Sequence, residues 1–375
     1  MVNVNLITLG LAVGFGFAAT VALLLVSRAP GLRDLFTRAR GPLERPRWGG
    51  LAILFAFGIT PFVASAVSER ATELFEPKSG DFLSFLAACA LVCALGFVDD
   101  VRPLGWRPRL LVQIAAASAV YAAGYEIAEL GLPWGPEFDV GFIAPVLTVV
   151  WIVFFTNAFN FVDGRDGVSL GVAILAAATM AAVASNAGHP TVALLLIAMA
   201  GAGLGVLPFN LPPASAYIGD SGAYLLGFII GSLSIRAATG AGDAVFIAVP
   251  AVALGFPILD TMLAAVRRML DHRHPLGRDD DHIHHRLEVT GFGPRGLLVV
   301  VYGVSALFAG GALLLHYVHF FALEVAVAVG TLSIIAVILT KLGYVLSLWN
   351  SASMIWVRRR LRWVEEPAGT SDSDA

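Results

Sequence analysis

The chain has few charged residues and almost no cysteine. Of its 375 residues only 14% are charged and two are cysteine, whereas 58% are hydrophobic. About a quarter of the residues of a soluble domain are charged, so this composition excludes an ordinary soluble fold. The cysteines, Cys89 and Cys93, stand four positions apart in a hydrophobic run, on one face of a helix. We interpret them as small packing residues rather than a disulfide or a metal-binding pair.

Long hydrophobic runs fill most of the chain. Stretches of about 15–23 residues with little or no charge are long enough to cross a membrane as helices. They predict an all-α, polytopic integral membrane protein with about eleven transmembrane helices. The expected spans are 5–26, 50–67, 82–98, 110–125, 142–158, 168–185, 190–207, 221–235, 245–266, 297–315 and 321–343. Residues 1–350 then form a single multi-span domain, and 351–375 a cytoplasmic basic segment with a disordered acidic tail.

The basic residues predict the orientation. With the N-terminus outside, all of the 24 Lys and Arg residues except Arg70, Lys78 and Arg236 lie on or beside the inner segments. The positive-inside rule therefore favours an outer N-terminus and a cytoplasmic C-terminus.

Four polar clusters interrupt the hydrophobic sequence, and this orientation puts all of them on the cytoplasmic face. They are Asp99-Asp100, Asn157 to Asp166, Gly219 to Gly222 and Asp279 to His285. Ionisable groups at membrane depth indicate a functional site, and carboxylate and amide oxygens suit Mg²⁺ together with substrate phosphates. Taken singly, each cluster also fits a simpler role: a polar loop at 157–167, a solvated helix end at Asp99-Asp100, a helix cap at Asp220.

The run from Arg278 to Arg286 contains the three histidines His282, His284 and His285. Their spacing is not a usual structural zinc pattern, and no cysteine accompanies them. Histidine and arginine facing carboxylates suit a bound phosphate or diphosphate. Acids for a cation, basic groups for phosphate and a membrane for a lipid together indicate phosphoryl transfer.

In sequence and order these motifs resemble the polyprenyl-phosphate N-acetylhexosamine-1-phosphate transferases. The histidine run is similar to the bacterial branch that makes undecaprenyl-linked GlcNAc. The residues that carry the resemblance lie within 45–293: Arg47-Trp-Gly49-Gly50, Gly96-Phe-Val-Asp99-Asp100, Asn157-Ala-Phe-Asn160-Phe-Val-Asp163-Gly-Arg-Asp166-Gly167, Tyr217-Ile-Gly-Asp220-Ser-Gly, Pro257-Ile-Leu-Asp260-Thr261 and Asp279 through Arg286.

The resemblance implies transfer of N-acetylhexosamine 1-phosphate, GlcNAc 1-phosphate in this branch, from a UDP-sugar to polyprenyl (undecaprenyl) phosphate. UMP would be released, in the initiating step of cell-envelope polysaccharide synthesis. The implied cofactor is Mg²⁺, with Mn²⁺ as an alternative, and the implied location is the bacterial plasma (inner) membrane. The expected partners are UDP-N-acetylhexosamine, the polyprenyl phosphate lipid and the membrane, and no nucleic acid; a homodimer stays open.

The resemblance also implies roles for individual residues. Asp220 would be the principal Mg²⁺ ligand and Asn157 a second oxygen donor. Catalytic roles are expected for Asp99 and Asp100, which would orient or deprotonate the lipid phosphate, and for Asp163, beside the metal and nucleotide. The expected substrate-binding residues are Asn160, Asp166, His282, His284, His285 and Arg286.

Two positions depart from the family pattern. The first cytoplasmic loop has Gly41 after Arg38-Ala39-Arg40, where an Arg-Lys-x-His type run is usual, and Arg165 stands where an aliphatic residue is usual. Because of these departures, a non-catalytic or differently specific relative of the same fold remains an alternative. An acid-lined transporter and an intramembrane aspartyl protease are further alternatives, but transport sites usually lie at the midplane between repeats, and such proteases need only two acids.

Overall fold

The structure is a computed structural model that describes residues 2–27, 46–74, 80–131, 137–240, 244–270, 293–318 and 321–341. Several sequence predictions lie outside these residues: the run from Arg38 to Gly41, the four residues His282, His284, His285 and Arg286, and the segment 351–375.

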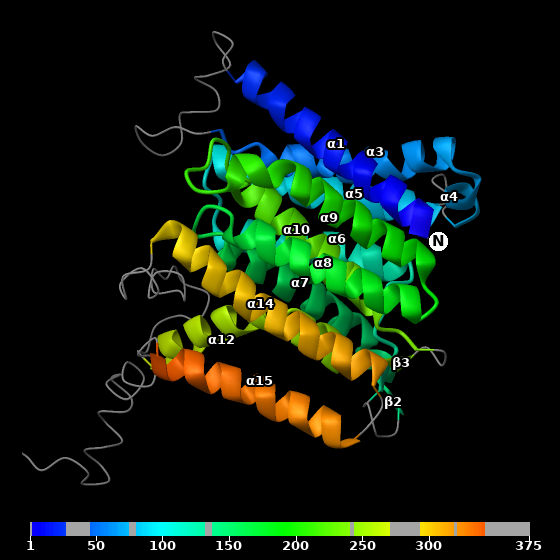
Figure 1. The fold of residues 1–375 in the computed structure, drawn as a ribbon, viewed down its shortest axis with the longest axis vertical. Helices are drawn as coiled ribbons and strands as arrows, with labels where there is room; N and C mark the ends of the chain where they lie inside the picture. The colour runs from blue at the N-terminus through cyan, green and yellow to red at the C-terminus, as the bar shows by residue number, and fades with distance from the viewer. Residues whose placement is uncertain are drawn as a thin grey trace, which may run out of the picture.

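The described chain is an assembly of helices that lie side by side across one block, with strands at one end (Figure 1). The helices are α1 (Val2–Val26), α3 (Gly49–Val67), α4 (Glu69–Leu74), α5 (Gly80–Val101), α6 (Trp106–Ala122), α7 (Ala144–Val162), α8 (Val168–Asn186), α9 (Pro190–Asn210), α10 (Gly219–Ala237), α11 (Ala248–Ala253), α12 (Gly255–Leu270), α14 (Pro294–Tyr317) and α15 (Phe321–Lys341). The short elements are β1 (Glu129–Gly131), β2 (Glu137–Asp139), β3 (Ala244–Val245) and the 3-10 helix η1 (Gly141–Ile143).

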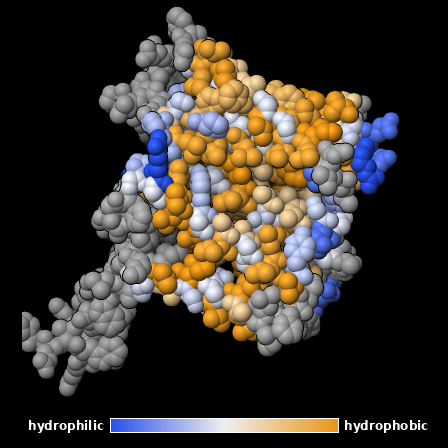
Figure 2. Space-filling view, in the orientation of Figure 1, coloured by the Kyte–Doolittle hydropathy of each residue, from blue (hydrophilic) through white to orange (hydrophobic). Residues whose placement is uncertain are grey.

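The expectation of a helical, polytopic membrane protein is confirmed. Among the described residues seven segments are long and apolar enough to cross a membrane: Val4–Val26, Gly49–Val67, Asp81–Val101, Gly141–Val162, Val168–Asn186, Pro190–Asn210 and Pro294–Tyr317. A band of apolar side chains covers the middle of the face seen in Figure 2, with hydrophilic residues toward its two ends. Such a band is the surface that a hydrocarbon layer requires.

One expected span is not a single helix. The stretch 245–266 begins as β3, continues as α11, and resumes as α12 after Leu254. Leu254 lies outside the helical region (φ −97°, ψ 20°), and Pro257 follows three residues later. Because Pro257 provides no backbone N–H, it cannot donate the helical hydrogen bond to Ala253, the last residue of α11, so a continuous helix would lose a bond at this point. The hydrophobicity of this stretch therefore predicted burial but not continuity.

Helix α10 lies at the centre of the assembly. It packs against α3, α5, α7, α8 and α9, and almost all of its residues are buried. Close packing depends on glycine: a Cβ at Gly50 of α3 would lie 2.3 Å from the backbone nitrogen of Gly222, and one at Gly96 of α5 would lie 2.4 Å from Cα of Ser221. Small residues at helix contacts let backbones approach in this way. The N-terminal end of α10 is thus held directly against α3 and α5.

A three-stranded sheet of order β2-β1-β3 marks the opposite end of the assembly. Strand β1 pairs antiparallel with β2 (Leu130 opposite Phe138) and parallel with β3 (Leu130 opposite Val245). Because β3 follows the C-terminal end of α10, this sheet lies about 28 Å, one helix length, from the N-terminal end. Very short strands in a mostly apolar chain gave no recognisable alternation, so the sequence did not indicate them.

Candidate active site

The N-terminal end of α10 is capped by a carboxylate from another helix. Asp100, at the end of α5, accepts the backbone N–H of Asp220 at Oδ1 and that of Ser221 at Oδ2, both at 3.1 Å. A helix leaves its first N–H groups without intrahelical partners, and an acid there also interacts favourably with the helix dipole. Asp100 therefore fixes the backbone that carries Asp220.

Gly219 allows this contact between the two helices. Its φ is +69°, in the left-handed region, and a Cβ at this position would lie 2.4 Å from Oδ2 of Asp100. Both the backbone conformation and the contact thus require glycine. The Gly-Asp pair in the sequence is explained by a turn that presses a carboxylate against a helix end.

Asp99, the neighbour of Asp100, serves a different group of residues. Its Oδ2 accepts hydrogen bonds from Nη1 of Arg109 (3.1 Å) and from the hydroxyl of Tyr224 (3.2 Å), and its Oδ1 accepts the N–H of Leu104 (2.6 Å). Arg109 also donates to the Tyr224 hydroxyl at 3.1 Å. Since Asp99 is buried, these charge-assisted bonds offset the cost of removing its charge from water. They fix Arg109 at the start of α6.

The loop 163–167 is held by several contacts from outside it. Gly167 adopts a left-handed conformation (φ +80°), its N–H donates to Oδ1 of Asn210, and its carbonyl accepts the hydroxyl of Tyr302 at 2.7 Å. Oδ2 of Asp166 accepts the N–H of Ala214 at 2.9 Å. Asp166 is thereby tied to the segment that leads into α10.

The two asparagines of α7 bind different partners. Nδ2 of Asn160 donates to Oδ1 of Asp220 at 2.9 Å. Asn157 exchanges hydrogen bonds with Gln113 of α6, the shorter running from Asn157 Nδ2 to Gln113 Oε1 at 2.7 Å. Asn160, and not Asn157, is therefore the asparagine in contact with the proposed metal ligand Asp220.

A polar cavity of about 370 Å³ lies at the centre of this region. The acids on its wall are Asp163, Asp166 and Asp220, and the basic residues are Arg47 and Arg165. Burial, and next the charges of Asp220 and Asp100, raise the pKa of the Asp163 carboxyl well above its usual value. The cavity thus concentrates negative charge that a cation would stabilise.

An apolar cavity of about 450 Å³ is lined by residues of α6 and α7 and by Thr261 of α12. Leu110, Ile114, Val150 and Phe154 are among its apolar residues, and its polar ones include Arg109, Gln113, Asn157 and Asn160. Since Asn160 also bonds Asp220, this one side chain lies at the boundary between the apolar cavity and the acids.

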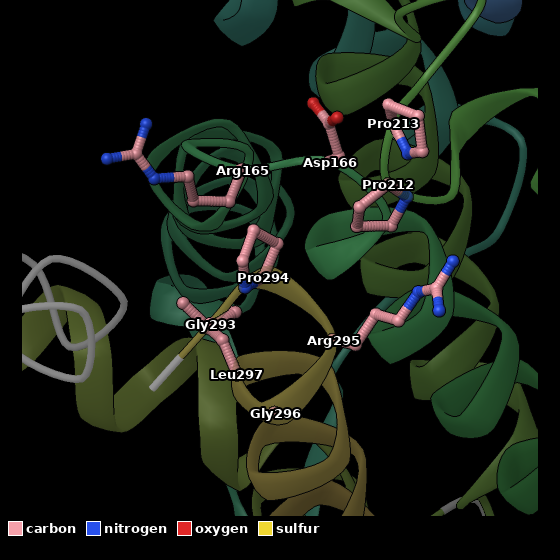
Figure 3. A pocket seen from close by; sticks show the side chains of 9 residues that line it. All are labelled: Arg165, Asp166, Pro212, Pro213, Gly293, Pro294, Arg295, Gly296 and Leu297. Carbon is pink, nitrogen blue, oxygen red and sulfur yellow. The ribbon is translucent and has the colours of Figure 1, made fainter. Parts of the chain in front are cut away.

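A third cavity, of about 580 Å³, adjoins the polar one (Figure 3). Arg165 and Asp166 belong to both, and the other walls are Pro212, Pro213 and the first residues of α14. In Figure 3 the guanidinium of Arg165 and the carboxylate of Asp166 point in different directions.

The structure thus brings together, around the start of α10, every predicted site residue that it describes. Asp163, Asp166 and Asp220 line the polar cavity, while Asp99 and Asn157 lie on the side of the apolar one. Sequence reasoning missed Gln113, Tyr224, Asn210 and Arg109 as members of the site. Gln113 is a buried amide in an apolar helix, and Tyr224 follows Asp220 by one helical turn, so both gave a signal that could have been read.

The residues fit a Mg²⁺ ion that shares its coordination with substrate phosphates. In the described part of the chain no group of three or more His, Cys, Asp or Glu side chains is arranged to hold a metal by itself. Mg²⁺ keeps several waters and takes one or two carboxylates together with phosphate oxygens. Asp220, with its oxygen fixed by Asn160, and the nearby Asp163 would be sufficient protein ligands of that kind.

Comparisons with known proteins identify the family of the chain. The profile of the family described as glycosyl transferase family 4 matches residues 82–238, which contain all of the acids above. A protein of Bacillus subtilis (strain 168) named "Probable undecaprenyl-phosphate N-acetylglucosaminyl 1-phosphate transferase" is 32% identical over 271 residues, 72% of this chain and 73% of its own. The "Decaprenyl-phosphate N-acetylglucosaminephosphotransferase" of Mycolicibacterium smegmatis is 32% identical over 322 residues, 79% and 77% of the two chains. With this extent of identity, the chain belongs to glycosyl transferase family 4.

Proposed function

We propose that this protein transfers N-acetylhexosamine 1-phosphate, specifically GlcNAc 1-phosphate, from a UDP-sugar to a polyprenyl phosphate and releases UMP. The observation that carries the proposal is the junction of two unlike cavities at one hydrogen bond. Asn160 lines the apolar cavity, Asp220 lines the polar one, and the two side chains are 2.9 Å apart. A reaction between a lipid phosphate and a soluble nucleotide sugar needs such a boundary, because its substrates come from different solvents.

The apolar cavity suits the lipid substrate. Aliphatic and aromatic side chains would hold the isoprenoid units nearest the phosphate, and Arg109 would face the phosphate itself. Arg109 is oriented by Asp99 and Tyr224, so it can hold an anion without rearranging. In this proposal Asp99 acts through Arg109, and Asp100 through the backbone of Asp220.

The polar cavity suits the donor diphosphate and Mg²⁺. Asp220 and Asp163 would hold Mg²⁺, which when bound would neutralise the negative charge of the phosphates. Asp166 and Asn210 fix the shape of the loop that forms one wall. Phosphoryl transfer depends mainly on such positioning and charge stabilisation.

The chemical step needs no covalent help from the protein. An oxygen of the lipid phosphate forms a bond to the β-phosphorus of the donor, and the bond from that phosphorus to the bridging oxygen breaks. The electron pair leaves with that oxygen on UMP, and the sugar remains on the new polyprenyl diphosphate. The chain's residues hold the two phosphates in line and keep the site shielded between α5, α7 and α10.

The distribution of charge supports a cytoplasmic location for the site. Four described basic residues, Arg47, Arg109, Arg165 and Arg295, line the three cavities at this end, in accord with the positive-inside rule. We therefore propose an outer N-terminus, a cytoplasmic C-terminus, about eleven spans once α6, α10, α12 and α15 are added to the seven segments above, and a bacterial plasma membrane as the location.

Transfer of radiolabel from UDP-GlcNAc to undecaprenyl phosphate by the purified protein, with and without Mg²⁺, tests the proposal. We expect a labelled lipid, one UMP released per transfer, and loss of both with a chelator. Absence of product with GlcNAc, GalNAc and modified hexosamine donors would favour a non-catalytic relative.

A further inference from the structure

Arg47 is the basic residue most firmly attached to the backbone around Asp220. The segment that carries it runs beside residues 217–218: the N–H of Tyr217 donates to the carbonyl of Pro46 (2.9 Å), and the N–H of Gly49 to the carbonyl of Tyr217 (3.0 Å). The N–H of Gly50 continues this pairing to Ile218 at 3.1 Å. These bonds give Arg47 a fixed starting point on the wall of the polar cavity.

The side chain of Arg47 is weakly engaged for a charge in that position. Its single hydrogen bond to the described residues runs from Nη1 to Oδ1 of Asp100 and is long, at 3.4 Å. A guanidinium has five N–H donors, and the side chain is 37% exposed beside the cavity. Asp100, in turn, does not depend on Arg47, because both of its oxygens accept backbone N–H groups.

Arg109 provides the contrast. Two partners, Asp99 and Tyr224, fix it at 3.1 Å each, and it lines the apolar cavity. Of the three cavities described above, Arg47 lines the polar one, and it is held by its backbone more than by its side chain. The adjacent acids Asp99 and Asp100 thus each hold one arginine, and each arginine faces a different cavity.

We propose that Arg47 is a substrate-binding residue for the nucleotide sugar, and that its guanidinium binds the donor diphosphate in the polar cavity. The inference rests on the proposed function and adds a residue to it. Arginine presents a planar pair of N–H groups that matches two phosphate oxygens, so one side chain can bind and orient the diphosphate. The long contact with Asp100 keeps the guanidinium near the cavity until the donor arrives.

The location also explains why the bound group is the donor rather than the lipid phosphate. The lipid's apolar chain belongs in the apolar cavity, where Arg109 already provides a cation. The polar cavity, by contrast, has three acids on its wall, so an anionic donor entering with Mg²⁺ gains from each additional cation there. Arg47 and Arg165 both line this cavity, so the two can contact different parts of one ligand.

Steady-state kinetics of Arg47→Gln and Arg47→Lys test the inference, with Arg70→Gln as the control. Arg70 makes an exposed ion pair with Glu73 on α4, away from the acids, and its loss should leave transfer unchanged. For Arg47→Gln we expect turnover to fall about 10²-fold and the KM for UDP-GlcNAc to rise, because a charge-stabilising donor is lost. Arg47→Lys should show a smaller loss, since the charge remains but the paired geometry does not. The KM for undecaprenyl phosphate should be unchanged in both.

Two further readouts separate ligand binding from a structural role. UMP should inhibit Arg47→Gln more weakly than the wild type, and added guanidinium chloride at millimolar concentration should restore part of the turnover of Arg47→Ala. A structural defect at Arg47 would not by itself weaken inhibition by UMP, and guanidinium chloride would not restore the turnover. If Arg47→Gln does not accumulate in membranes, Arg47→Lys carries the same test through its KM values and UMP inhibition.

The outcomes are distinct. Wild-type protein without any transfer would contradict the proposed function itself. An active wild type with unchanged donor KM and UMP inhibition in the Arg47 variants would overturn the role of Arg47. A rise in the KM for the lipid phosphate alone would also overturn it and would assign Arg47 to the other substrate.

Discussion

The carboxylate of Asp100 accepts the backbone N–H of Asp220, across 120 positions of sequence, at 3.1 Å. The position of the Asp220 side chain is therefore set by a residue of another helix as well as by its own. The two acids therefore have different roles. Both oxygens of Asp100 accept hydrogen bonds from the start of α10, whereas the carboxylate of Asp220 lines the cavity and accepts a hydrogen bond from Asn160.

Replacement of Asp220 by alanine should abolish transfer while the protein still accumulates in membranes. Asp100 bonds the backbone of residue 220 and not its side chain, so the helix start can persist without the carboxylate. Radiolabel transfer and a membrane immunoblot check this prediction, and turnover near that of the wild type would exclude Asp220 as a metal ligand.

The Mg²⁺ concentration needed for transfer should rise as the pH falls. The pKa of Asp163 is raised, so its proton is lost only at a higher pH than for an ordinary aspartate, and a protonated carboxyl binds Mg²⁺ poorly. The Mg²⁺ concentration for half-maximal rate should therefore fall as pH rises through that pKa. Asp163→Asn, which has no proton to lose, should flatten this dependence; an equally steep dependence in the variant would assign it to another group.

The raised pKa of Asp163 also affects the stability of the folded protein. A carboxyl with a folded-state pKa above its unfolded value favours the folded protein at low pH, and this contribution is lost as pH rises above the unfolded value. Asp163→Asn removes a negative charge that the neighbouring acids Asp220 and Asp100 make unfavourable, so above neutral pH without Mg²⁺ the variant should unfold at a higher temperature than the wild type. Thermal unfolding in detergent at several pH values measures the difference.

Gln113→Leu should affect the lipid substrate more than the donor. The change leaves the Asn157 amide without its 2.7 Å partner in the wall of the apolar cavity, which should shift that side chain. We expect the KM for polyprenyl phosphate to rise several-fold with the KM for UDP-GlcNAc unchanged. Equal rises in both constants would mean that the two cavities are not separate substrate sites.

Gly219→Ala should damage both stability and transfer. The new methyl group would meet the Asp100 carboxylate in a backbone conformation that alanine rarely adopts, at a cost of about 1–3 kcal/mol. Gly303→Ala in α14 is the matched control, because a Cβ there meets nothing within 4 Å. The control should be neutral or slightly stabilising, since alanine is the better helix former. Unfolding temperatures and transfer rates of the two variants distinguish a local effect at Gly219 from a general one of added methyl groups.

The sequence was sufficient to predict the long helices and the positions of the acids along them, but not which partner each acid binds. Hydrophobic runs predicted the long helices near their observed positions except across 245–266, where the chain leaves the helix at Leu254, and they did not predict the short helix α4. Asp99 and Asp100 looked equivalent as neighbours, yet one holds Arg109 and Tyr224 and the other caps α10. Such differences depend on contacts between distant helices, which local spacing does not encode. The roles predicted for His282, His284, His285 and Arg286 stay predictions.

The enclosure of α10 bears on how the surrounding bilayer can influence the enzyme. Membrane thickness acts on helices that touch lipid, which tilt or bend when their apolar length does not match the hydrocarbon layer. Helix α10 is shielded by five neighbours, and at its far end Arg236 is bound to the Gly124 carbonyl at 2.8 Å. A change in lipid composition would therefore reach the outer helices first and Asp220 only through them, so that the same catalytic geometry can persist in membranes of different thickness.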